Sequence, residues 1–175
     1  MKKTLFIIIP LSFLILYSIT AAYSLSESNV EDIIICSTND DTHYIPNKGC
    51  EFYLFNFRTS KNDIQYLESG SGLAFLFGIK DINKRYIYLD HFLSKGMSID
   101  TQSNIDGLPP LHSAILLNDL KLVKYLIEKG VNTMQTERNY ELTPLSFLQK
   151  LNENNDFIDR APIENFLTSI NSKSQ

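Results

Sequence analysis

The sequence predicts an all-α protein in which about four pairs of short helices stack side by side as a solenoid. Residues 107–132 (GLPPLHSAILLNDLKLVKYLIEKGVN) contain two short apolar runs at helical spacing, separated by a polar break. Each run is too short to bury its apolar face alone, so the unit needs neighbouring copies. Residues 89–96 (LDHFLSKG) align with residues 123–130 (VKYLIEKG) at an offset of 34. Pro144 follows Pro110 at the same offset, which indicates internal repetition.

The ends of the two helices in residues 107–132 follow from their punctuation. Pro110 can open the first helix, because its missing N–H costs nothing in the first turn. Asn118 and Asp119 separate the two runs. Gly130 ends the second run, since glycine readily adopts the left-handed conformation just past a helix.

This stretch resembles an ankyrin repeat, whose pattern is roughly G-x-T-P-L-H-x-A followed by V-x-x-L-L-x-x-G-A. The matching residues are Gly107, Pro110, Leu111, His112, Ala114, Val123, Leu126, Ile127 and Gly130. The sequence departs from the pattern at Pro109, in place of the usual Thr, and at Asn118, in place of the Gly between the helices. The resemblance implies that His112 has a structural role and forms a hydrogen bond between neighbouring units.

Residues 1–24 are predicted to be a secretory signal peptide. Two lysines precede an apolar run from Leu5 to Ile19, and small residues follow it. Thr20 and Ala22 suit the −3 and −1 cleavage positions, with Ala22 and Ser24 as the second choice. An uncleaved inner-membrane anchor is the alternative, although about fifteen apolar residues is short against the roughly twenty that span a bilayer.

The only two cysteines, Cys36 and Cys50, are expected to form a disulfide if the protein is exported. Two free buried thiols are the alternative. A metal site is not expected, because no CxxC motif or paired histidine accompanies them. We predict that residues 25–49 form a non-repeat N-terminal cap pinned by this disulfide. Within the cap, residues 30–36 suit either a strand or a helix.

Ankyrin-like repeats are expected over residues 50–170, followed by a polar tail at 171–175. The expected helical pairs lie in residues 50–70, 73–96, 110–130 and 144–170. The last unit departs from the pattern: Glu141 stands where Gly107 stands one repeat earlier, and Ser146 replaces the histidine.

Composition excludes several functions. The chain has 16 Lys and Arg and 20 Asp and Glu, a net charge of −4; removal of the first 24 residues leaves 14 against 20, or −6. An acidic domain gains little from phosphate backbones or anionic lipids, so nucleic acid and membrane-surface partners are not expected. No nucleophile elbow, HExxH motif, phosphate loop or GxGxxG is present. We therefore expect no enzyme activity, metal or cofactor.

The ankyrin resemblance implies a variable concave surface made by loop tips and inner helices. On matching positions this partner-binding surface comprises Ile105, Asp106, Leu108, Leu116, Leu117, Asn139, Tyr140 and Leu142. Several of these are large and apolar, as in protein-binding sites. The alternative is that Leu116 and Leu117 pack against the following hairpin.

The architecture resembles that of periplasmic immunity proteins, which bind and block toxic effectors from neighbouring cells, including lipase effectors of type VI secretion. This resemblance implies an exported, periplasmic protein that binds another protein, a secreted effector or toxin. A periplasmic protector or assembly factor for a resident enzyme, such as a catalase, is the second hypothesis. A hydrolase with an unrecognised site is the third.

Overall fold

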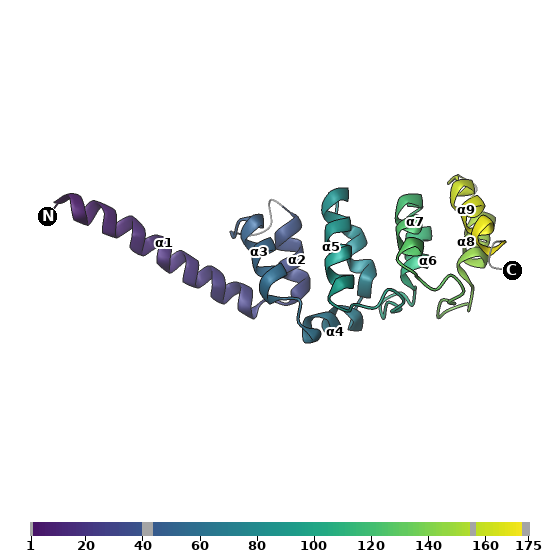
Figure 1. The fold of residues 1–175 in the computed structure, drawn as a ribbon, viewed down its shortest axis with the longest axis horizontal. Helices are drawn as coiled ribbons and strands as arrows, with labels where there is room; N and C mark the ends of the chain where they lie inside the picture. Colours follow the sequence, from purple (N-terminus) through teal and green to yellow (C-terminus); the bar gives the residue numbers. More distant parts are fainter. Residues whose placement is uncertain (1, 40–43, 155–156, 173–175) are drawn as a thin grey trace. The chain divides into compact units, whose positions relative to one another are not determined.

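The computed structural model describes residues 2–39, 44–154 and 157–172, with side chains from residue 10 onward except Asn154 and Asn171. All secondary structure within these residues is helical, which confirms the predicted all-α class (Figure 1). In chain order the elements are α1 (Lys2–Glu27), α2 (Val30–Thr38), α3 (Asn47–Phe57), α4 (Lys61–Ser69), the 3₁₀ helix η1 (Gly72–Gly78), α5 (Ile82–Ser94), α6 (Pro110–Leu116), α7 (Leu120–Glu128), α8 (Pro144–Asn154) and α9 (Ala161–Asn171).

The chain forms two compact units, residues 1–63 and 64–175. In the first unit α2 and α3 pack against each other. The pairing differs from the prediction, which joined residues 50–57 with the helix that follows them. The reason is the apolar stripe of α2: Val30, Ile33 and Ile34 are buried, as is Leu54 of α3, so α2 is a full partner for α3.

Residues 30–38 form a helix and not a strand because the first turn is capped. The side chain of Asn29 accepts a hydrogen bond from the backbone N–H of Asp32 at 2.8 Å. Glu31 and Asp32 lie in the first turn, where a negative charge interacts favourably with the helix dipole.

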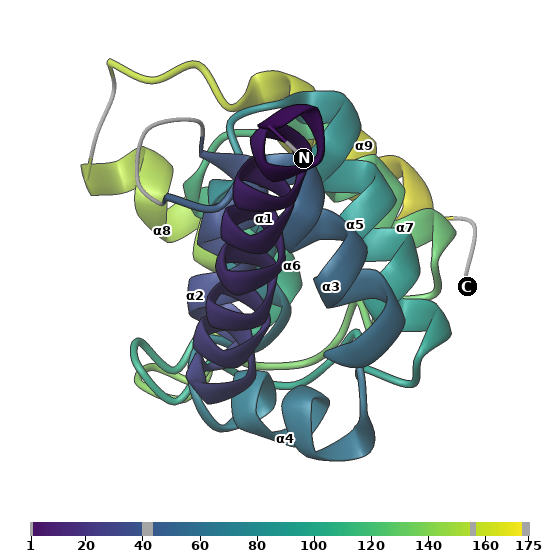
Figure 2. The ribbon, with the colours of Figure 1, turned by 90° about the vertical axis from the view of Figure 1, so that its left-hand side faces the viewer.

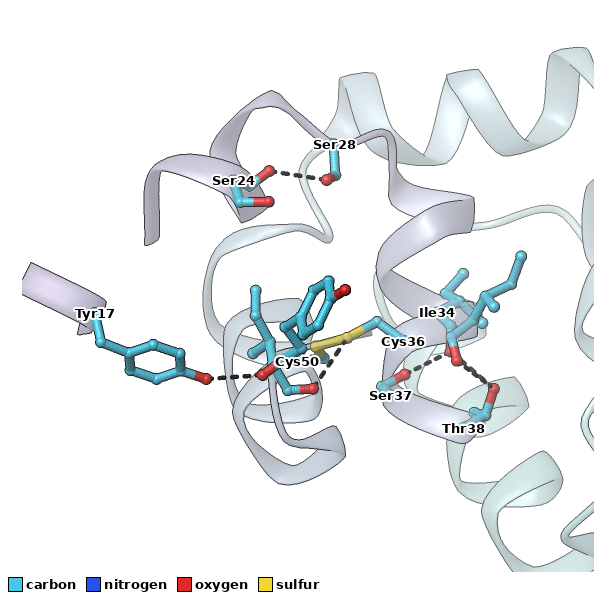
Figure 3. The surroundings of a disulfide bond; sticks show 11 residues. Tyr17, Ser24, Ser28, Ile34, Cys36, Ser37, Thr38 and Cys50 are labelled. Carbon is cyan, nitrogen blue, oxygen red and sulfur yellow. Dashed lines mark hydrogen bonds between the residues drawn. A yellow bond between two sulfur atoms is a disulfide. The ribbon is translucent and has the colours of Figure 1, made fainter. Parts of the chain in front are cut away.

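The disulfide between Cys36 and Cys50 is present and buried, so the predicted covalent link within the first unit is confirmed. Its surroundings are drawn in Figure 3. The Ser37 and Thr38 hydroxyls both donate to the Ile34 carbonyl, at 2.7 and 2.8 Å, which satisfies polar groups in the last turn of α2.

The buried part of the first unit begins at Leu25. Residues 10–24 of α1 have no buried side chain, whereas Leu25 is buried. The guanidinium Nη1 of Arg58 donates to the carbonyls of Leu25 and Ser28, at 3.0 and 2.6 Å. Asp63 accepts from Nε of Arg58 at 3.0 Å and holds the guanidinium in place. Arg58 thus ties the end of α1 to the rest of the unit by satisfying carbonyls that the helix leaves free.

Helix α1 continues through the predicted cleavage region. Among the residues that the structure describes, no helix has both the length and the apolar character needed to cross a bilayer. Of the predicted tail at 171–175, residues 173–175 lie outside the described residues.

The described residues of the second unit form three helical pairs, η1 with α5, α6 with α7, and α8 with α9. Helix α6 contacts both η1 and α8, so the first helices of the pairs form a row. Figure 2 shows α6 and α8 on one side of this unit and α5, α7 and α9 on the other. The pairs share a core whose fully buried side chains include Leu73, Leu76, Tyr88, Leu89, Phe92, Leu111, Ile115, Leu122, Val123, Leu126 and Leu148.

The start of α5 is fixed by its cap. The polar residues 81–84 are the N-cap and first turn of the helix. Asp81 accepts hydrogen bonds from the N–H groups of Asn83 and Lys84, at 2.9 and 3.1 Å. Asp119 caps α7 in the same way, through the N–H of Leu122 at 3.0 Å.

We predict that replacing Cys36 and Cys50 together by Ala lowers the free energy of unfolding of the first unit by about 3 kcal/mol, because a loop of this size is no longer closed in the unfolded chain. Urea unfolding with and without a thiol reductant measures the change. Reductant should destabilise the wild type and leave the double variant unchanged. A wild-type midpoint that stays constant after verified reduction would contradict the prediction.

Candidate protein-binding surface

Two connecting loops of the second unit, residues 95–109 (the first loop) and 129–143 (the second loop), have the same backbone frame. The N–H of Ser103 donates to the Leu108 carbonyl at 3.0 Å. One repeat later, the N–H of Glu137 donates to the Leu142 carbonyl at 3.1 Å. Since both partners are displaced by 34 residues, the repetition seen in the sequence extends to the loops.

Each loop is also bonded to its neighbour along the stack. The N–H of Asn104 donates to the Gly70 carbonyl at 2.8 Å, and the N–H of Arg138 donates to the Gly107 carbonyl at 3.1 Å. The loops are therefore rigid parts of the scaffold and can hold side chains at fixed positions.

Two polar side chains set the direction of the loop tips. The Ser103 hydroxyl accepts from the N–H groups of Ile105 and Asp106, at 3.2 and 3.4 Å. The Glu137 carboxylate accepts from the N–H groups of Asn139 and Tyr140, at 2.6 and 2.8 Å. Ser103 and Glu137 therefore orient four of the predicted binding residues.

Glu137 is buried, yet its carboxylate remains charged. Burial alone would raise its pKa, but hydrogen bonds from the backbone N–H groups of Asn139, Leu142 and Tyr140 outweigh burial and lower the pKa. The sequence analysis did not identify Ser103 or Glu137. Their common signal is a polar acceptor at the same repeat position, two residues before the tip of each loop.

A groove of about 220 Å³ lies between η1, the first loop and α6. Its walls combine apolar side chains with three serines and one aspartate: Ser71, Ala74, Phe77, Ser103, Ile105, Asp106, Ser113, Leu116 and Leu117. Such a concave, mostly apolar site with a few polar groups is typical of a surface that receives another molecule.

Four of the eight predicted partner-binding residues line this groove. Ile105, Leu116 and Leu117 are 77%, 48% and 58% exposed, and Asp106 is also exposed. At this exposure, Leu116 and Leu117 retain a large apolar area in contact with solvent. The groove therefore has apolar walls on both its loop side and its helix side.

The other predicted residues lie elsewhere. Asn139 and Tyr140 are exposed on the second loop, where Tyr140 is 78% exposed, and Leu142 is half-buried. Leu108 differs from the prediction because it is only 8% exposed. Its N–H donates to the Asp106 carboxylate at 3.1 Å, and its side chain packs in the core, so it is not available to a partner.

His112 joins α6 to the second loop. The ring is fully buried, and Nε2 donates to the Leu142 carbonyl at 2.9 Å. It meets Phe147 of α8 edge-on, with ring centroids 5.1 Å apart. Burial lowers the pKa of His112, against the opposing effects of the Leu142 carbonyl and the Glu137 carboxylate. The neutral ring is thus a structural hydrogen-bond donor between units.

The remaining predicted repeat residues form or support this scaffold. Pro110, Leu111 and Ala114 are buried on α6, and Gly107 and Gly130 have positive φ angles of 73° and 87°. Within the described part of the chain, no three His, Cys, Asp or Glu side chains are grouped to hold a metal ion.

The geometry defines a helical-repeat scaffold with an exposed apolar groove. Residues 85–127, from α5 through most of α7, match the family model for ankyrin repeats (many copies). No curated protein and no solved structure matches the chain. The ankyrin match and the all-helical pairs together indicate a protein–protein interaction module.

We predict opposite effects for substitutions at the two equivalent loop positions, Gly107 and Glu141. Gly107 has φ of 73°, and a Cβ there would lie 2.9 Å from Cβ of Arg138. Gly107→Ala should therefore lower the free energy of unfolding by about 1–2 kcal/mol. Glu141 has φ of 56°, so Glu141→Gly should raise the free energy of unfolding by about 0.5–1 kcal/mol, because glycine adopts this conformation without strain.

Urea unfolding of both variants beside the wild type measures these changes. Gly96→Ala is the matched control, because Gly96 also has a positive φ, 95°, but a Cβ there would meet no atom within 4 Å. A loss at Gly107 no larger than at Gly96 would exclude a steric contribution from Arg138.

A second prediction concerns pH. Because the pKa of folded His112 lies below its usual 6.5, the unfolded state binds more protons between the two values. The contribution of the neutral His112 ring to the free energy of unfolding is therefore complete above pH 6.5. It is lost as the pH falls through the pKa of His112 in the folded state. His112→Gln should cost about 1–2 kcal/mol at neutral pH and flatten the dependence of stability on pH.

Chemical unfolding of the wild type and His112→Gln, at neutral pH and about one unit below pH 6.5, measures this dependence. Glu137 stays ionised over that range. The His91→Gln variant, which retains His112, should keep the part of the slope that His112 causes. Equal slopes for the wild type and His112→Gln would contradict the prediction.

Proposed function

We propose that this protein binds another protein through the groove between η1, the first loop and α6. The observation that carries the proposal is the exposure of Ile105, Leu116 and Leu117 around one hollow. The helical pairs do not need these side chains, since the core is formed by other residues. Exposed apolar groups beside polar ones support a role in recognition.

The charge around the groove favours a partner with a basic surface. The chain has a net charge of −4, or −6 without residues 1–24. Asp106 lines the groove, and one of its carboxylate oxygens accepts from the N–H of Leu108. A partner that places an apolar side chain in the groove beside a Lys or Arg would match both features, and opposite charge would speed association.

The partner we propose is a toxic effector delivered by neighbouring bacteria, with a type VI secretion lipase as the candidate class. In this role the protein would be a periplasmic immunity protein. Three features support export to the periplasm: the charged start, apolar middle and small-residue end of residues 1–24, the disulfide, and the start of the buried unit at Leu25, after that segment. The resemblance to exported ankyrin-repeat immunity proteins supports the partner class.

A capture experiment tests the proposal. The oxidised chain from Leu25 to Gln175 is used to retain partners from a lysate of the source organism and of its neighbours, and the bound proteins are identified by mass spectrometry. A secreted hydrolase that is inactive while bound is the expected result. A resident periplasmic enzyme that remains active would replace the immunity role by that of a protector or assembly factor.

Leu117→Asp should weaken binding of the captured partner at least about 30-fold, because a charge replaces a central apolar contact. Calorimetric or optical titration measures the change. Ile82→Asp is the control: Ile82 is 51% exposed at the start of α5, outside the groove. Both variants should unfold at the wild-type temperature. Equal affinity of the two variants would exclude the groove as the binding site.

A further inference from the structure

The basic residues of this acidic chain are concentrated on two neighbouring helices. Residues 81–95 and 119–129, which are α5 and α7 with their caps, hold six of the 16 Lys and Arg and four of the 20 Asp and Glu. The excess is two positive charges, whereas the net charge of the whole chain is −4. The charge of the molecule is therefore uneven.

Three lysines, two on α7 and one at its C-cap, lie over aromatic rings of the second unit. Nζ of Lys121 is 5.0 Å from the ring centroid of Tyr86, and Nζ of Lys129 is 5.4 Å from that of Tyr125. Lys124 lies 5.3 Å from the ring of Phe166 on α9. Cation–π contacts of this length hold the ammonium groups at defined positions without neutralising their charge.

The rings that support these lysines are themselves fixed. Tyr86 and Tyr125 contact each other with centroids 4.9 Å apart. The Tyr125 hydroxyl donates to the Asp90 carboxylate at 2.9 Å, and Lys129 forms an ion pair with the same carboxylate. This arrangement joins α5 to α7, so the lysines belong to a rigid surface of two helices.

Lys121 and Lys124 remain free to bind an external anion. Arg85 pairs with Asp119 at 2.9 Å and Lys129 with Asp90, but within the part of the chain that the structure describes no carboxylate pairs with Lys121 or Lys124. We call this surface, made of Tyr86, Asp90, Lys121, Lys124, Tyr125 and Lys129, the basic face.

The basic face is separate from the groove. The groove is lined by η1, the first loop and α6, and none of its lining residues belongs to the basic face. A partner in the groove would therefore leave Lys121 and Lys124 accessible.

We propose that the basic face is a second docking surface, and that its occupant is an acidic helical segment of another protein. Charge complementarity selects an acidic partner. Asp90 and Glu128 lie among the lysines, and these carboxylates would be repelled by a uniformly anionic bilayer. A protein can instead match the alternation of sign, with carboxylates opposite Lys121 and Lys124 and a neutral or basic group opposite Glu128.

Titration of the oxidised, isotope-labelled protein with a designed peptide, followed by NMR, tests this proposal. The peptide is a helix of about 20 residues with Glu on every turn of one face, long enough to span α7; a peptide with Gln in place of Glu is the ligand control. We expect amide shifts on α5 and α7 with the Glu peptide only, and weaker binding at an ionic strength that reduces the Debye length to about 3 Å.

Lys121→Glu with Lys124→Glu should weaken binding of the Glu peptide about tenfold. Lys61→Glu with Lys80→Glu is the matched control, because both lysines are exposed and lie outside the two helices. If the first variant does not fold, the salt dependence in the wild type still decides. Shifts confined to the groove, equal binding of the Gln peptide, or binding only to phosphatidylglycerol vesicles would each overturn the proposal.

Discussion

The hydrogen bond from His112 to the Leu142 carbonyl is the interaction on which the arrangement of the helical pairs most depends. It leaves a buried ring on α6 and reaches the loop that precedes α8, so it ties one pair to the next. The bond from Arg138 to the Gly107 carbonyl repeats the same connection in the backbone. Buried donors and acceptors are costly when unpaired, so these bonds fix the spacing of the pairs more strictly than apolar packing alone could. The bond from the N–H of Asn104 to the Gly70 carbonyl makes the equivalent connection one step earlier, beside the groove between η1 and α6.

Much of this fold was predictable because its signals are local. Pro110 and Gly130 mark the ends of a helical pair through backbone preferences that hold in any context. The pairing of α3 with α2 was not predictable in this way. Both α2 and α4 carry an apolar face that could cover Leu54 of α3. Spacing along the chain does not encode which of the two helices packs there. Residues 72–78 form a 3₁₀ helix, whose backbone N–H groups bond the carbonyl three residues back instead of four, and apolar spacing does not encode that difference.

In the candidate site, too, some features follow from the sequence pattern and others only from the folded structure. Ile105, Leu116 and Leu117 could be assigned to the groove because the repeat pattern fixes which face each position occupies. Leu108 was assigned incorrectly because a single residue of displacement in a tight loop changes the side chain from solvent to core. Glu137 was missed because its role exists only once the loop has folded and three backbone N–H groups point at one carboxylate. Sequence pattern identifies the scaffold positions, whereas these roles arise from the loop geometry that the scaffold creates.

The net charge of the sequence does not predict which partners each surface of the folded protein can contact. A total of −4 describes the field far from the molecule, beyond about one Debye length, and there it favours basic partners. At contact distance the relevant charge is that of one face. Lys121 and Lys124 stand on aromatic rings, and neither these lysines nor those rings line the groove that contains Asp106. An acidic protein can therefore carry a surface that favours acidic partners, provided that the lysines are held together by the fold, and a three-dimensional scaffold of this kind can present two binding surfaces of opposite preference.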